Sequence, residues 1–210
     1  MLTTVVLDVG ETLVDETAHW TAWAQHLGVP AFTLFAALGG LVARGQDHRE
    51  VVRLVRPDTD FATEQPRVTM APLELYPDAL PCLQALHAGG WRTVVGGNQP
   101  EVFQRLVEQL GLPVDLVTSS GELGAEKPSP EFYARLAVNA GARPEECVHV
   151  GDRADNDLAG AAAAGMTVVH LRRGPWALLH PPQGGYGISS LAELPPLLGE
   201  LRSRTATPAS

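Results

Sequence analysis

The stretch TTVVLDVG, residues 3–10, decides the fold of this chain. Its short, β-branched apolar run, ended by Gly10, predicts a buried strand over residues 3–9. Asp8 stands at the end of that run, and an isolated buried carboxylate is costly unless a cation or hydrogen bonds compensate its charge. Asp8 is therefore the first candidate functional residue, and Gly10 leaves no partner acid two positions later.

Strand and helix patterns alternate along the chain from residue 79 onward. The expected strands lie at residues 91–95, 114–118, 147–150 and 167–171, and the expected helices at residues 79–87, 101–110, 130–140, 158–164 and 191–201. Repeated strand–helix units require a mainly parallel sheet that is covered on both faces. The sequence therefore predicts an α/β fold with a doubly wound, mainly parallel sheet and a Rossmann-like core.

A helical block separates the first strand from the repeated units. Apolar residues recur at spacings of three and four between residues 16 and 55, and a Pro-rich stretch follows to residue 75. Because this block is too long for a crossover, we expect a small α-helical cap at residues 16–73. The α/β core then comprises residues 1–15 and 74–201, and residues 202–210 are expected to form a flexible tail.

Composition and charge restrict the class of protein. The chain has 210 residues, of which 45% are hydrophobic, as in ordinary globular proteins. Its net charge of −9 argues against nucleic-acid binding because a basic footprint is missing. The sequence has no signal-peptide pattern and no apolar run long enough for a bilayer, so we expect a cytoplasmic protein without membrane association. It does not predict the oligomeric state.

Polar residues follow four of the expected strands. These residues are Asp8 after the first strand, Gly97 and Asn98 after the second, Lys127 in the loop after the third, and Asp152 with Asp157 after the fourth. Open parallel sheets bind ligands at the carboxyl ends of their strands. We therefore expect the acids and the lysine to converge there.

These residues resemble the motifs of the haloacid dehalogenase-like hydrolases over residues 2–173. The four motifs match, in order, Asp8, Asn98, Lys127-Pro128-Ser129-Pro130, and Gly151-Asp152 with Asn156-Asp157. The resemblance implies a Mg²⁺-dependent hydrolase that acts on a small phosphorylated metabolite, with Asp8 as the nucleophile that forms an aspartyl phosphate. It also implies a set of metal ligands: Asp8, the backbone carbonyl of Gly10, Asp152 and Asp157.

The resemblance implies roles for the remaining motif residues as well. Lys127 would neutralise the nucleophile and the phosphoryl oxygens. Gly97 and Asn98 of the second motif would bind the substrate, and backbone N–H groups near Gly10 and Gly97 would hold the phosphoryl group. Lys127 is thus expected in the catalytic set with Asp8, and the other two residues in the substrate-binding set.

Two departures from the family pattern fall on phosphoryl chemistry. Gly10 stands where phosphatases of this family carry a second Asp, and general acid–base catalysis contributes about 10²–10⁴-fold to the rate. Glu11 is the nearest carboxylate in the sequence, but we expect it to point elsewhere. Gly97 replaces a Ser or Thr hydroxyl before Asn98. We therefore expect weakened acid–base catalysis.

Two other functions stay open. A degenerate member could bind a phosphorylated ligand or a partner without turnover. Another chemistry of the Asp nucleophile, dehalogenation or phosphonate cleavage, is the second alternative. Dehalogenases of the superfamily need fewer acids in the fourth motif, whereas this chain keeps Asp152 and Asp157. Phosphonate cleavage would require a lysine in the cap, and residues 16–73 contain none.

Overall fold

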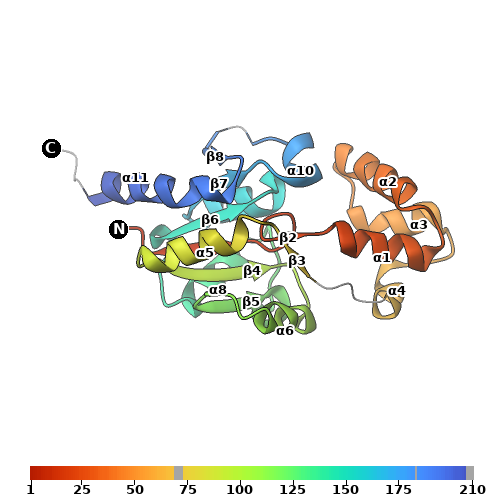
Figure 1. Cartoon of the computed structure of the whole chain (residues 1–210), viewed down its shortest axis with the longest axis horizontal. Helices are drawn as coiled ribbons and strands as arrows, with labels where there is room; N and C mark the ends of the chain where they lie inside the picture. Colours follow the sequence, from red (N-terminus) through yellow and green to blue (C-terminus); the bar gives the residue numbers. More distant parts are fainter. Residues whose placement is uncertain (69–72, 183, 207–210) are drawn as a thin grey trace.

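The computed structural model describes residues 1–68, 73–182 and 184–206. Figure 1 shows an α/β core with a helical insertion beside it. The core holds a parallel six-stranded sheet in the order β5-β4-β1-β6-β7-β8. The strands are β1 (Thr4–Leu7), β4 (Arg92–Gly97), β5 (Leu116–Ser119), β6 (Cys147–Gly151), β7 (Thr167–Leu171) and β8 (Tyr186–Ile188). The predicted α/β fold with a doubly wound, parallel sheet is confirmed.

Alternate residues of β1 enter two hydrophobic layers, because successive side chains of a strand point to opposite faces. Val5 and Leu7 belong to the layer formed with α5 (Ala79–Ala88) and α11 (Leu194–Ala206). Val6 belongs to the layer on the other face, which includes residues of α8 (Pro130–Asn139). Strand β1 is thus buried on both sides, which explains why its sequence is apolar without alternation.

The remaining core helices include two that the sequence predicted and two that it did not. The predicted ones are α6 (Glu101–Gln109) and α9 (Ala159–Ala163), and the others are α7 (Ser120–Leu123) and α10 (Gly174–Leu179). A π-helical turn at Ala154–Leu158 and 3-10 turns at Pro144–Glu146 and Leu191–Glu193 complete the core. Helices α7 and α10 and strand β8 are too short for a hydrophobic period to appear in the sequence.

The end of the last helix corrects one prediction. Helix α11 continues to Ala206, so residues 202–206 are helical and not part of a flexible tail. The Arg202 guanidinium lies 3.5 Å from the centre of the Trp91 ring and donates to the Gly89 carbonyl at 3.3 Å, which secures this end of the helix. Residues 207–210 of the predicted tail lie outside the described residues.

The helical insertion lies between β1 and α5 and has a hydrophobic cluster of its own. Its elements are α1 (Thr17–Leu27), α2 (Ala31–Ala43), a 3-10 turn at His48–Glu50, α3 (Val51–Val55), α4 (Phe61–Glu64) and a 3-10 turn at Gln65–Arg67. Trp23, Leu34 and Val51 are fully buried in this cluster. Trp176 of α10 joins it from the core. The insertion and the core therefore share an apolar contact.

Two short strands stand at the two ends of the insertion. Strand β2 (Val14–Asp15) pairs antiparallel with β3 (Glu74–Leu75), so the chain leaves and re-enters the core at neighbouring points. The pair falls beside the predicted boundaries of the cap. The division into core and cap stays a proposal, and residues 69–72 of the predicted cap lie outside the described residues.

Within the described residues, no single helix is long and apolar enough to cross a bilayer. Helices α1 and α2 meet that criterion only as a pair, and they are bent by 112° at the break between them. Gly28 lies at this break with a φ of 64°, a conformation that glycine adopts at the end of a helix without strain.

Candidate active site

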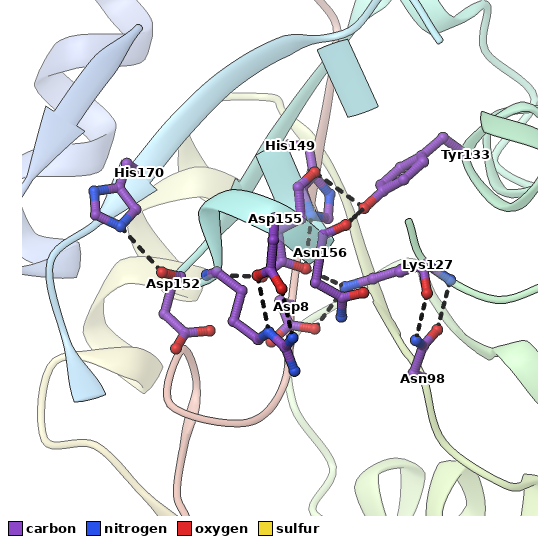
Figure 2. Close-up of polar contacts among 11 residues, drawn as sticks. Asp8, Asn98, Lys127, Tyr133, His149, Asp152, Asp155, Asn156 and His170 are labelled. Carbon is purple, nitrogen blue, oxygen red and sulfur yellow. Dashed lines mark hydrogen bonds and ion pairs between the residues drawn. The ribbon is translucent and has the colours of Figure 1, made fainter. Parts of the chain in front are cut away.

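The residues predicted as a site come together at the carboxyl edge of the sheet (Figure 2). Asp8 directly follows β1, and Asp152 directly follows β6, its neighbour in the sheet. Asn98 directly follows β4, the other neighbour of β1. Lys127 comes from the loop before α8, and Asp157 lies in the π-helical turn after β6. Segments far apart in the sequence thus supply one cluster.

Lys127 lies at the centre of this cluster and is the only lysine of the chain. Its side chain is fully buried, with Nζ 2.5 Å from Asp8 Oδ1 and 2.8 Å from Asp157 Oδ1. Burial alone would lower the pKa of Lys127, but the charges of Asp157 and Asp8 outweigh it and raise the pKa. The ammonium group is therefore charged and forms ion pairs with two carboxylates.

Asn98 holds the lysine loop in place. Its Nδ2 donates to the Lys127 carbonyl at 2.9 Å, and its Oδ1 accepts from the Lys127 backbone N–H at 2.7 Å. Both ends of the side-chain amide are thus engaged with the backbone of Lys127, and the substrate-binding role of Asn98 stays a prediction. Gly97 lies next to Asp8, since a Cβ added to Gly97 would be 3.5 Å from Asp8 Oδ1.

A glycine lets α9 approach the same loop. A Cβ added to Gly160 would lie 2.8 Å from the Pro128 carbonyl carbon and 2.5 Å from Tyr133 Cε2, which is too close for any side chain. The loop that carries Lys127 and the helix that follows Asp157 can therefore pack together only because this position lacks a side chain.

Asp8, Asp152 and Asp157 form the candidate metal centre. One oxygen of each lies within 4.8 Å of the others, and this is the only such group that the described residues contain. Burial raises the pKa of Asp8 to about 6, with a further contribution from the charge of Asp157. Burial and the charges of Asp157 and Asp8 raise the pKa of Asp152 as well. Carboxylates this close repel each other unless a cation lies among them.

Asp152 gives the most direct indication of a cation. Its Oδ2 is buried, and no group in the described part of the chain donates a hydrogen bond to it. A buried carboxylate oxygen without a partner is costly. Three carboxylates with one unsatisfied oxygen fit Mg²⁺, which prefers oxygen ligands. The backbone carbonyl predicted as a further ligand belongs to Gly10, in the turn after β1.

Asp157 is the most strongly stabilised acid of the cluster. Besides Lys127, it accepts from the Arg153 backbone N–H at 3.1 Å, and His149 Nε2 lies 3.4 Å from its Oδ1. Burial alone would raise the pKa of Asp157, but Lys127 and His149 hold it below its usual range. Asp157 is therefore ionised and holds the lysine in position.

Three residues behind the acids were not predicted. Tyr133 Oη donates to the carbonyls of Asn156 at 2.6 Å and of Asp157 at 3.0 Å, as Figure 2 shows. His170 Nε2 lies 3.0 Å from the Asp152 carbonyl. Tyr133 and His170 thus hold the backbone that carries the acids, whereas His149 contacts the side chain of Asp157. The only sequence signal for the two histidines was a polar residue inside an apolar strand.

The two glutamates after Gly10 point in different directions. Glu11, at a φ of 52°, accepts from Tyr76 Oη at 2.7 Å and from the Glu16 backbone N–H at 3.0 Å. It is thus turned to Tyr76, in line with the expectation that it points elsewhere. Glu16, which the sequence did not single out, lies with its carboxylate beside Gly10. Burial and the charge of Glu11 raise the pKa of Glu16 to about 7.

Comparison with protein families matches residues 2–165 to the haloacid dehalogenase-like hydrolases, as the motifs indicated. The glyceraldehyde 3-phosphate phosphatase of Methanopyrus kandleri is 37% identical over 128 residues, which are 59% of this chain and 51% of that protein. The phosphoglycolate phosphatase of Rhodospirillum rubrum is 33% identical over 165 residues, 77% of this chain and 66% of that protein. The (S)-2-haloacid dehalogenase 1 of Pseudomonas sp. (strain CBS-3) is 34% identical over 131 residues, 60% of this chain and 57% of that protein.

The matched part of this chain thus spans between half and two thirds of the length of these relatives. Solved structures share the fold over nearly the whole chain. The HAD-hydrolase YfnB of Bacillus subtilis has a TM-score of 0.73 at 16% identity, with 94% of this chain and 98% of that chain covered. Its low identity makes this a likeness of fold alone.

Proposed function

This chain belongs to the haloacid dehalogenase-like hydrolases, and from that premise we propose that it is a magnesium-dependent phosphatase of a small phosphorylated metabolite. Asp8 is the proposed nucleophile, which forms an aspartyl phosphate that water then hydrolyses. The observation that carries the proposal is the fully buried Lys127 ammonium between Asp8 and Asp157, close to the buried acid Asp152. A buried lysine next to a strand-end acid supplies the positive charge that the acid needs when it attacks an anionic substrate.

The charges of the site fit that reaction. Attack of a carboxylate on a phosphate ester brings negative charges together, so positive charge must offset them. Lys127 offsets the charge of Asp8, and bound Mg²⁺ would supply further positive charge to the phosphoryl oxygens. The proposed Mg²⁺ ligands are Asp8, the Gly10 carbonyl, Asp152 and Asp157. Gly97 and Asn98 are proposed to bind the phosphoryl group through backbone N–H groups.

The substrate is proposed to be small. Relatives named glyceraldehyde 3-phosphate phosphatase and phosphoglycolate phosphatase support this. We propose that residues 16–73 act as a cap that excludes water and large substrates, since Trp176 of the core packs into the cluster of the insertion. The cytoplasmic location predicted from the sequence stays a prediction.

Dehalogenation is the alternative that one relative favours, because it is named a haloacid dehalogenase. Gly10 also removes the second Asp that phosphatases of the family carry. Against it stands the group of Asp8, Asp152 and Asp157, which a reaction without a metal does not need. Non-catalytic binding of a phosphorylated ligand is the third possibility, and the same assay separates all three.

The assay measures phosphate release from an aryl phosphate and from a panel of small phosphorylated metabolites, with Mg²⁺ and with EDTA. We expect turnover that requires Mg²⁺ and no halide release from 2-haloacids. Halide release without Mg²⁺ would instead establish dehalogenation. Thermal stabilisation by a phosphorylated metabolite without any turnover would establish a binding protein.

Mg²⁺ is expected to raise the melting temperature of the wild-type protein. A ligand that binds the folded state at a hundred times its Kd adds about 2.7 kcal/mol to the free energy of unfolding. Asp152→Asn should lose most of this shift, because it removes the carboxylate whose Oδ2 has no partner among the described residues. The measurement is thermal unfolding with and without Mg²⁺.

Asp155→Asn is the matched control, because Asp155 lies three residues away, pairs with Arg153 at 2.8 Å and is not part of the acidic group. It should keep the full Mg²⁺ shift. An equal shift in wild type and in Asp152→Asn would show that Mg²⁺ binds elsewhere.

A further inference from the structure

The space beside Gly10 is occupied by another carboxylate. A Cβ added to Gly10 would lie 2.9 Å from Glu16 Cδ, 3.5 Å from Glu16 Cγ and closer still to Glu16 Oε1. The distances to Cδ and Oε1 are shorter than real Cβ contacts, so the end of the Glu16 side chain fills the volume in which a side chain at position 10 would begin. The Glu16 carboxylate thus occupies the space that an Asp side chain at position 10, two residues after Asp8, would need.

Contacts on both sides of Glu16 hold its carboxylate there. Its backbone N–H donates to Glu11 Oε1 at 3.0 Å, and its Oε2 accepts from Trp20 Nε1 at 3.2 Å. Within the described residues no hydrogen bond to Oε1 is present, and this is the oxygen nearest Gly10. Glu16 is half-buried, with Oε2 fixed by Trp20 and Oε1 beside Gly10.

Neither helix capping nor the candidate metal group accounts for this position. Glu16 precedes α1 at its N-cap, but its side chain makes no capping hydrogen bond to the helix. It is not a member of the group formed by Asp8, Asp152 and Asp157 that could hold a metal. Glu11, the other candidate acid, is engaged by Tyr76. Glu16 is therefore the carboxylate that remains for proton transfer.

We propose that Glu16 is the general acid and base of this enzyme and replaces the carboxylate that Gly10 lacks. The proposal rests on the proposed phosphatase function. In the first step Asp8 forms a bond to phosphorus, the bond from phosphorus to the ester oxygen breaks, and Glu16 gives its proton to that oxygen. The products are an alcohol, aspartyl phosphate and ionised Glu16.

The second step returns every group to its starting state. Ionised Glu16 takes a proton from water as the water oxygen bonds to phosphorus. The bond from phosphorus to Asp8 breaks, and its electron pair returns to the Asp8 carboxylate. Phosphate leaves, and Glu16 is protonated again. No further reactant is needed, and the glycine at position 10 is required because Glu16 uses its space.

The test compares an alkyl with an aryl phosphate in wild type and in Glu16→Gln. Aryl oxygens leave as anions without a proton, whereas alkyl oxygens need one. We expect Glu16→Gln to reduce alkyl phosphate turnover by about 10²-fold or more and aryl cleavage in the first step by less than tenfold. Because the second step also loses its base, phosphorylated Glu16→Gln enzyme should accumulate during turnover of the aryl phosphate. The intact mass of the protein after a rapid quench measures this.

Glu74→Gln is the matched control, since it neutralises an exposed carboxylate on β3 that lies outside the group of Asp8, Asp152 and Asp157. It should keep the wild-type ratio of alkyl to aryl turnover and accumulate no phosphoenzyme. If Glu16→Gln folds poorly, a second pair of variants tests whether a carboxylate beside Asp8 supplies the proton. Glu16→Ala clears the space beside Gly10, and Gly10→Asp added to it should restore alkyl turnover at least tenfold.

The outcomes separate the two proposals. A wild type that cleaves no phosphate ester would refute the phosphatase function. A wild type that does so, with alkyl and aryl turnover reduced equally in Glu16→Gln and no phosphoenzyme, would overturn the role of Glu16 alone. A double variant no faster than Glu16→Ala on the alkyl ester would overturn it in the same way.

Discussion

Replacement of Asp8 by Asn is expected to reduce phosphate ester turnover by about 10⁴-fold or more, because the amide cannot form the covalent bond to phosphorus. The fold should survive the change. Burial and the charge of Asp157 raise the pKa of Asp8 to about 6, so ionised Asp8 destabilises the folded protein at neutral pH. A neutral Asn removes that cost, while Lys127 keeps its partner Asp157.

The measurement is turnover together with thermal unfolding in Mg²⁺-free buffer. The variant should melt no lower than wild type and show no activity above background. Asp15→Asn, on β2 outside the acidic group, serves as the control and should keep its activity. An Asp8→Asn protein with turnover within tenfold of wild type would exclude Asp8 as the nucleophile.

Lys127→Met is expected to have the largest effect on stability. Met has a similar length and no charge, so the change leaves the carboxylates of Asp8 and Asp157 buried without their cation. Removal of one partner from a buried ion pair costs about 3–5 kcal/mol. At about 2–4 °C per kcal/mol for a chain of this size, the melting temperature should fall by roughly 6–20 °C. Turnover should be lost as well.

A surface ion pair provides the comparison. Arg105 lies 3.9 Å from Glu101, and both side chains are exposed, so Arg105→Met should change the free energy of unfolding by less than about 1 kcal/mol. Equal melting temperatures for Lys127→Met and wild type in Mg²⁺-free buffer would show that the buried ammonium does not hold the acids in place.

Strands with strong patterns could be predicted from the sequence. Residues 167–171 match β7 at both ends, and the strand expected at residues 147–150 is one residue shorter than β6. Such strands are buried on both faces, so an apolar, β-branched run bounded by turn residues is a sufficient signal. The order of the motifs then indicates the carboxyl edge of the sheet, where Asp8 and Lys127 do meet.

The directions of individual side chains in the site could not be predicted in the same way. The carboxylate of Glu16 reaches the site because the turn after β1 brings residue 16 back over Gly10, and no periodic pattern encodes that turn. The side chain of Asn98 holds the backbone of Lys127, a contact that the sequence did not indicate. Side-chain direction depends on the tertiary fold, which the spacing of residues does not determine.

The central claim is that Asp8 carries the phosphoryl group during turnover. The most direct test incubates the protein with an aryl phosphate and Mg²⁺, quenches the reaction rapidly in acid, and locates the added mass by peptide mapping. We predict one phosphoryl group on Asp8 itself, in wild type at short times and more abundantly in Glu16→Gln. Turnover that proceeds without a phosphoryl group on Asp8 at any quench time, in either protein, would contradict this mechanism.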